Sequence, residues 1–177
     1  MNKRVVISGG PCTGKTSIIN TLDKIGYPCL HEFSRHIIEE GIRTQNNIVP
    51  WGNLSAFTEK VFEGRIEQFN KGNEVKLAFY DRSIVDSIAY MEYDAVEVPQ
   101  KYIQGALEYR YFPKVFVTPF WEEIYTTDDQ RIEPIEKAQR LERYIIESYQ
   151  KFDYEVLIVP KMSIQDRIDF ILDHINE

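Results

Sequence analysis

The chain has 177 residues, 43% of them hydrophobic and 28% charged, with two cysteines and a formal net charge of −7. This length and composition predict one domain over residues 1–177, and the acidic balance argues against broad binding to nucleic acid or anionic membranes. Two cysteines are too few for a disulfide scaffold, and no segment has the pattern of a signal peptide or a membrane span. We therefore expect a cytoplasmic protein with reduced thiols and no integral membrane association.

The first feature along the chain is a glycine-rich loop between a predicted strand and a predicted helix. Residues 4–7 form a β-branched run typical of a buried strand, and residues 16–24 carry a helical pattern. Between them the sequence matches the phosphate-binding pattern G-x-x-x-x-G-K-S/T at Gly9, Gly14, Lys15 and Thr16. Because strand, loop and helix follow in this order, a chance glycine turn is a weak alternative.

This loop is expected to hold a nucleoside triphosphate. Its glycines let backbone amides turn toward phosphate oxygens, and the helix amino terminus adds the positive end of its dipole. Lys15 can reach the β- and γ-phosphates as a catalytic cation, and Thr16 can offer its hydroxyl to Mg²⁺. The predicted nucleotide-binding residues are Gly9, Gly10, Pro11, Cys12, Thr13, Gly14, Lys15, Thr16 and Ser17.

Strands and helices are predicted to alternate along the rest of the chain. The expected strands after the first are residues 27–31, 75–80, 114–118 and 155–159. The expected helices after the first are residues 34–40, 54–70, 84–91, 99–109, 134–151 and 163–175. The helix of residues 34–40 is expected to stop at Gly41. Such alternation predicts an α/β fold with a parallel sheet and helices on both faces, so that ligands bind at the carboxyl ends of the strands.

Asp81 and Arg82 follow the third predicted strand. Phosphate-loop proteins place an acidic partner of Mg²⁺ at such a strand end, so Asp81 is a candidate metal ligand. It is also a candidate catalytic base, and a simple turn aspartate is the alternative without function. Arg82 is expected either to contact a phosphate of the substrates or to pair with a neighbouring carboxylate.

Glu32 and Arg35 follow the second predicted strand, three residues apart. On one helical turn both side chains could face one cleft, where Glu32 could orient or deprotonate a substrate hydroxyl and Arg35 could bind the same substrate. The alternative is an exposed salt bridge at a helix start. Trp121, after the fourth strand, is a candidate wall of the substrate pocket.

A charged segment beginning near Asp128 precedes the long helix of residues 134–151. It could close over the triphosphate as a lid, with Arg131 stabilising charge on the transferred phosphoryl group. Glu133, Glu136 and Arg140 belong to the same charged group. The alternative is a solvated face with pairs such as Glu136 and Arg140.

Several of these segments together resemble the NadR-like AAA-type P-loop proteins. The phosphate loop of that family is similar to residues 7–17, and its element around a glutamate and an arginine resembles residues 31–35. Its strand end with Asp-Arg resembles residues 79–83, and its later segments resemble residues 121–125, 131–133 and 159–160.

This resemblance implies a five-stranded parallel sheet in the order 2-3-1-4-5 and the use of ATP or GTP with Mg²⁺. Relatives of the family include ribosylnicotinamide kinase and, more distantly, deoxynucleoside kinases. The positions of Lys15, Thr16, Glu32 and Asp81 then imply contacts with phosphates, Mg²⁺ or nucleoside hydroxyls. The predicted lid lacks a double-arginine motif, so the acceptor stays open.

Two functions are consistent with these residues. The first is a small-molecule kinase that moves the γ-phosphoryl group of ATP or GTP to a nucleoside-like acceptor. The second is a nucleotide-dependent binding or switch protein with slow ATPase or GTPase activity. Phosphoinositide binding is a weaker alternative. ATP is the preferred nucleotide because the Asn-Lys-x-Asp element of many GTP-selective proteins is absent.

Overall fold

A five-stranded parallel sheet forms the centre of the computed structural model, which describes residues 2–124 and 135–176. Its strands are β1 (Lys3–Gly9), β2 (Cys29–Leu30), β3 (Leu77–Asp81), β4 (Lys114–Thr118) and β5 (Glu155–Ile158). They lie in the order β2-β3-β1-β4-β5, which confirms the predicted topology. Arg131 and Glu133, and most of the proposed lid, lie outside the described residues.

The register of the strands brings their carboxyl ends to one edge of the sheet. Ile7 of β1 pairs with Asp81 of β3, and Gly9 pairs with Thr118 of β4. Leu30, the last residue of β2, pairs with Tyr80. The loop after β1, the residues after β2 and the end of β3 therefore meet at the same edge, as parallel strands require.

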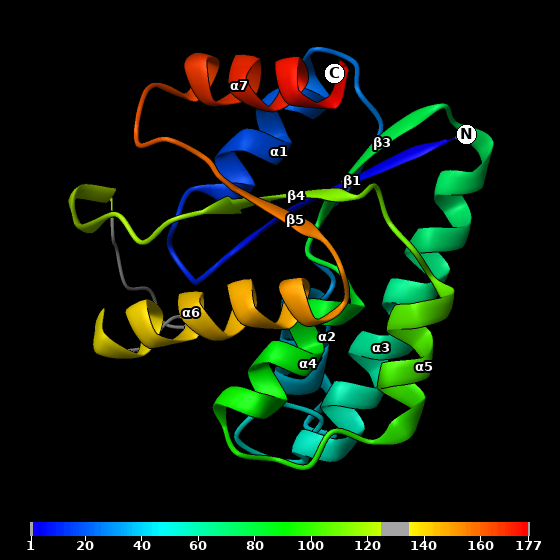
Figure 1. The fold of residues 1–177 in the computed structure, drawn as a ribbon. Coiled ribbons are helices and arrows are strands. Elements are labelled where there is room, and N and C mark those ends of the chain that lie inside the picture. Colours follow the sequence, from blue (N-terminus) through cyan, green and yellow to red (C-terminus); the bar gives the residue numbers. More distant parts are fainter. Residues whose placement is uncertain (1, 125–134, 177) are drawn as a thin grey trace.

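Helices cover both faces of this sheet. They are α1 (Lys15–Lys24), α2 (Ser34–Thr44), α3 (Leu54–Lys71), α4 (Ile84–Tyr93), α5 (Gln100–Glu108), α6 (Ile135–Lys151) and α7 (Ile164–Asn176), with short 3-10 helices at Gly72–Glu74 and Glu122–Ile124. Figure 1 shows α1 and α7 on one face and the other helices on the opposite face. Among the described helices, none combines the length and the apolar character that crossing a bilayer demands.

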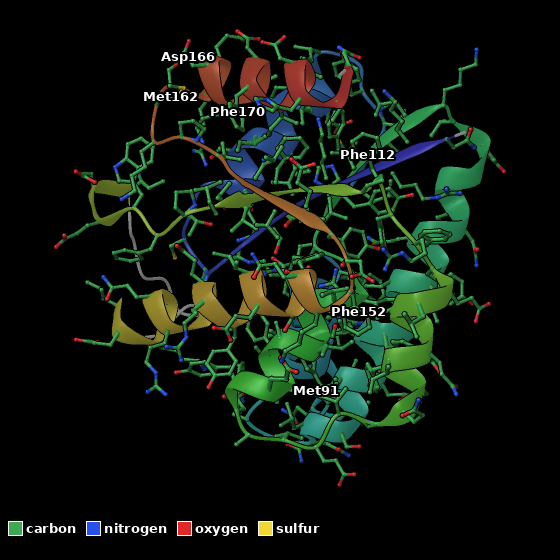
Figure 2. All side chains as sticks on the ribbon, in the orientation of Figure 1. Met91, Phe112, Phe152, Met162, Asp166 and Phe170 are labelled. Carbon is green, nitrogen blue, oxygen red and sulfur yellow. The ribbon has the colours of Figure 1, made fainter. Side chains whose placement is uncertain are left out.

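Alternating strand residues divide the hydrophobic core into two layers. Val5 and Ile7 point into the layer under α1 and α7, whereas Val6 points into the layer under α4 and α6. Figure 2 shows Phe170 of α7 on the first side and Met91 of α4 on the second. Because both faces of the central strands are covered, β1 reads as an unbroken apolar run rather than an alternating one.

Helix α2 does not stop at Gly41, so that prediction is wrong. The helix continues to Thr44, and its carboxyl end is the left-handed Gln45. Gly41 is buried where a Cβ would lie 2.7 Å from the carbonyl oxygen of Ile48. The glycine therefore allows the following loop to approach the helix closely, a long-range reason that the local pattern does not contain.

Candidate active site

The loop between β1 and α1 has the backbone of a phosphate-binding loop. Gly9 has φ 137° and Gly14 has φ 84°, which are conformations that favour glycine. A Cβ on Gly9 would lie 2.4 Å from the carbonyl oxygen of Thr118. The two glycines thus allow β1 to lie tightly against β4 and the loop to turn directly into α1.

Lys15 lies folded across this loop. Its ammonium donates to the carbonyl oxygen of Gly10 at 2.5 Å, and its side chain is buried. Burial, together with the nearby charge of Arg82, lowers the pKa of Lys15 to about 8. The ammonium also lies 3.4 Å from the Thr13 hydroxyl, so the loop holds a buried cation whose partners are uncharged and weaker acceptors than an anion.

Arg82 connects the ends of three strands. Its Nε donates to Glu32 Oε1 at 3.0 Å, while one Nη donates to the Gly9 carbonyl oxygen at 2.9 Å and lies 3.3 Å from Asp86 Oδ1. The residue is buried and has φ 76°, an uncommon conformation for a side chain of this size. Of the two roles predicted for Arg82, pairing with neighbouring carboxylates is the one that these contacts support.

Glu32 and Asp81 form a pair of carboxyl groups with different environments. Burial raises the pKa of Glu32, but Arg82, Lys15 and the hydroxyl of Ser34 outweigh it and lower the value to about 2. Burial and the charge of Glu32 raise the pKa of Asp81 to about 6. Glu32 is therefore fully ionised at neutral pH, whereas Asp81 is mostly ionised there and takes up a proton as the pH falls toward 6. Environment, rather than residue type, separates the two groups.

Lys15, Glu32 and Arg82 border one cavity of about 960 Å³. The loop residues from Pro11 to Ser17 line its middle. The lining residues that follow β2 or belong to the segment from α2 to α5, among them Glu32, Arg65 and Ser87, form the part of the cavity that we call the acceptor end. The lining residues Trp121, Ile124 and Arg167, with those of residues 162–164, form the part that we call the nucleotide end.

Most of the residues predicted from the sequence line this cavity, though at different ends. Glu32, Arg35 and Arg82 line the acceptor end. Trp121 lines the nucleotide end, where its ring centroid lies 5.9 Å from the guanidinium carbon of Arg167. Asp81 is 2% exposed and does not belong to the lining.

Four further residues at the site were missed by the sequence analysis: Arg65, Asp86, Tyr149 and Arg167. Arg65 and Arg167 each lie within the apolar stripe of a helix. A charged residue at such a position is a sequence signal that could have marked both as buried functional candidates. Arg167, on α7, donates to the Thr13 carbonyl oxygen at 3.0 Å and so helps to hold the phosphate loop in place. Asp86 and Tyr149 carried no comparable signal, because their partners come from distant segments.

Asp86 is the centre of a buried hydrogen-bond network. Its carboxylate accepts from the Ser8 hydroxyl at 2.5 Å, the Ser83 amide at 2.7 Å and the Tyr149 hydroxyl at 2.5 Å, besides its contact with Arg82. The Ser83 interaction closes a capping box at the start of α4. One carboxylate therefore fixes β1, α4 and α6 relative to the site.

Replacement of Asp86 by Asn is expected to lower the free energy of unfolding by about 3 kcal/mol, because it removes the charge that partners a buried arginine. Tyr149→Phe should cost less, about 1–2 kcal/mol, since it deletes one hydroxyl from the network. Urea unfolding monitored by circular dichroism measures both. The control is Tyr144→Phe on the same helix, whose hydroxyl has no hydrogen-bond partner in the described part of the chain. If Asp86→Asn lowers the free energy of unfolding no more than Tyr144→Phe does, the network does not stabilise the fold.

Comparison with solved structures shows the same fold in several kinases. A deoxyadenosine kinase from M. mycoides with bound dATP superposes with a TM-score of 0.70 at 16% identity, over 99% of this chain and 100% of that one. A thymidylate kinase from Ehrlichia chaffeensis has a TM-score of 0.66 at 16% identity, over 98% of each chain. A NadR protein in complex with NR has a TM-score of 0.68 at 15% identity, over 99% of this chain and 51% of that one.

Comparison of the sequence with known families assigns the chain to one of them. No curated protein matches the chain, but the family model described as an AAA domain matches residues 4–167. That range includes the phosphate loop, Glu32, Asp81, Arg82 and Arg167. Since the match extends over most of the sequence, and NadR shares the fold, the resemblance predicted from the motifs is confirmed: the chain belongs to this AAA domain family of P-loop proteins.

Proposed function

We propose that the protein is a Mg²⁺-dependent kinase that transfers the γ-phosphoryl group of ATP or GTP to a hydroxyl of a small nucleoside-like acceptor. The observation that carries this proposal is the single cavity that runs from the phosphate loop to Glu32. Its volume of about 960 Å³ lies at the upper end of ligand pockets, as two substrates side by side would need. The names of the similar structures, a deoxyadenosine kinase and a thymidylate kinase, support the same reaction class.

The loop residues and Lys15 hold the triphosphate in this proposal. Loop amides and the amino end of α1 bind phosphate oxygens, and Lys15 leaves the Gly10 carbonyl for the β- and γ-phosphates. The acceptor lies beyond the γ-phosphate, against Glu32 and Arg35. A cavity of this volume favours a kinase over a switch, because a switch does not need room for an acceptor.

Glu32 is the proposed catalytic base. It is 19% exposed, lines the cavity and is ionised, whereas Asp81 is buried below the lining. A carboxylate of Glu32 takes the proton of the acceptor hydroxyl as the new oxygen–phosphorus bond forms and the bond to the β-phosphate oxygen breaks. Arg82 holds Glu32 in place through its Nε.

The residues present fit a Mg²⁺ ion that is bound mainly by the nucleotide. Within the ranges that the structure describes, no group of three or more His, Cys, Asp or Glu side chains is arranged so that it could hold a metal ion by itself. The Thr16 hydroxyl borders the cavity, and Asp81 Oδ1 is buried with no hydrogen-bond partner among the described groups. Mg²⁺ commonly takes one or two protein ligands and completes its shell with phosphates and water, where it neutralises phosphate charge.

A screen of acceptors tests the proposal. The protein is incubated with Mg²⁺ and γ-labelled ATP or GTP and a panel of nucleosides and related alcohols, and the label is located by chromatography. We expect transfer to at least one nucleoside. If label passes only to water while calorimetry shows that the nucleotide binds, the kinase function is wrong and a hydrolytic switch replaces it.

A further inference from the structure

Unpartnered polar atoms gather around the cavity. Within the described chain, four buried side-chain atoms have no hydrogen-bond partner: Arg65 Nε, Asp81 Oδ1, Ser87 Oγ and Arg167 Nε. Three of these residues line the cavity, and Asp81 lies directly below it. Buried polar groups are nearly always satisfied in folded proteins, so unpaired atoms at a cavity require a partner from its contents, which are water or a ligand.

Arg65 is the most informative of these groups. It is 3% exposed, it projects from α3 within an apolar stripe, and it lines the acceptor end. Its closest hydrogen bond, from Nη1 to the Asp81 carbonyl oxygen, is 3.5 Å long, and no ion pair joins it to a carboxylate in the described residues. A guanidinium has five donors and no acceptor, so this site requires hydrogen-bond acceptors from its ligand.

The surroundings of Arg65 narrow the class of ligand. Phe57, Tyr90 and Tyr102 line the same end of the cavity and suit a flat ring. The carboxylates of Asp94 and Glu97 also line this end, together with Glu32, and they disfavour a phosphate or another anion beside the ring. A neutral ring that carries a carbonyl oxygen meets both conditions.

From these observations we infer that the acceptor is a nucleoside with an oxo-bearing base edge, which Arg65 reads through its guanidinium, with Ser87 as a second unpartnered polar group in the same cavity lining. This inference rests on the proposed kinase function and specifies its substrate. Arginine pairs with the two acceptors of a 6-oxopurine edge, whereas an amino group would place a donor against a donor. Ser87 is 8% exposed and its hydroxyl has no partner in the described chain, so it can serve either a carbonyl or a ring nitrogen.

Matched nucleosides test this inference. Inosine is compared with adenosine and uridine with cytidine, because each pair differs by one oxo group against one amino group. We expect the wild-type protein to bind and phosphorylate the oxo member of each pair about 10- to 100-fold better. Arg65→Met keeps the length of the side chain and removes its donors, so it should abolish the preference while triphosphate affinity is unchanged. Arg143→Met, at an exposed site on α6, is the control.

The measurements of base preference and of phosphoryl transfer test this inference separately from the kinase function on which it rests. Any of four results overturns the inference. The protein uses both members of a pair equally, it prefers the amino member, it prefers a nucleoside monophosphate, or its preference for the oxo member survives in Arg65→Met. If Arg65→Met does not fold, the wild-type comparison decides alone. If no nucleoside receives label, the kinase function fails, and calorimetric affinities of the four nucleosides in the presence of a nonhydrolysable ATP analogue still decide the base preference.

Discussion

Lys15→Ala is expected to abolish tight triphosphate binding, with a loss of affinity of about 100-fold or more. Lys15 is the cation inside the loop, and its ammonium is already desolvated and held by two uncharged groups, the Gly10 carbonyl and, at 3.4 Å, the Thr13 hydroxyl. Exchange of that carbonyl for charged phosphate oxygens is therefore strongly favourable. Calorimetric titration with ATP and GTP in Mg²⁺ measures the loss.

The matched control for this change is Lys24→Ala, which removes an exposed lysine from the last turn of the same helix. Its affinity should equal that of the wild type. The pKa of Lys15 near 8 adds a second expectation: since the ammonium is charged below that value, affinity should be constant below pH 8 and decline above it, by up to about tenfold per pH unit. Unchanged affinity in Lys15→Ala would show that the triphosphate does not bind in this loop.

Glu32→Gln is expected to lower the rate of phosphoryl transfer by about 10²- to 10⁴-fold while nucleotide affinity changes little. Glutamine keeps the shape of the side chain and can still accept from Arg82, but it cannot take the proton of the acceptor hydroxyl. Single-turnover transfer with labelled ATP separates this loss from binding. Glu39→Gln, at an exposed position on α2, is the control.

The pH dependence of the rate distinguishes Glu32 from Asp81 as the base. A base with the pKa of Glu32, about 2, is ionised throughout the working range, so the rate should be constant between pH 5 and 7. A base with the pKa of Asp81, about 6, would give a rate that rises with pH through that value and levels off above it. A rise of this kind, together with near-normal activity of Glu32→Gln, would transfer the role to Asp81.

The phosphate loop and the topology could be predicted because their determinants are local. The glycines, Lys15 and Thr16 stand at fixed spacing between a β-branched run and a helical pattern, and strict alternation of strands and helices limits the sheet to parallel pairing. Because parallel strands end at one edge of the sheet, the sequence also predicted that Glu32 and Asp81 lie near each other. Errors were confined to ends of elements, as at Gly41, where a contact with Ile48 overrides the local tendency of glycine to end a helix.

The partners of the site residues were decided by the tertiary structure alone. Arg82 could have met a phosphate or a carboxylate, and only the fold brings it to Glu32, 50 residues away, and to the Gly9 carbonyl, 73 residues away. Arg167 reaches Thr13 across 154 residues. Pairings over such separations depend on which faces of α3, α4 and α7 turn toward the sheet edge. The sequence therefore determined which loop is proposed to hold a triphosphate, while packing decided which buried charges face the cavity, because burial and partner choice are properties of the whole fold.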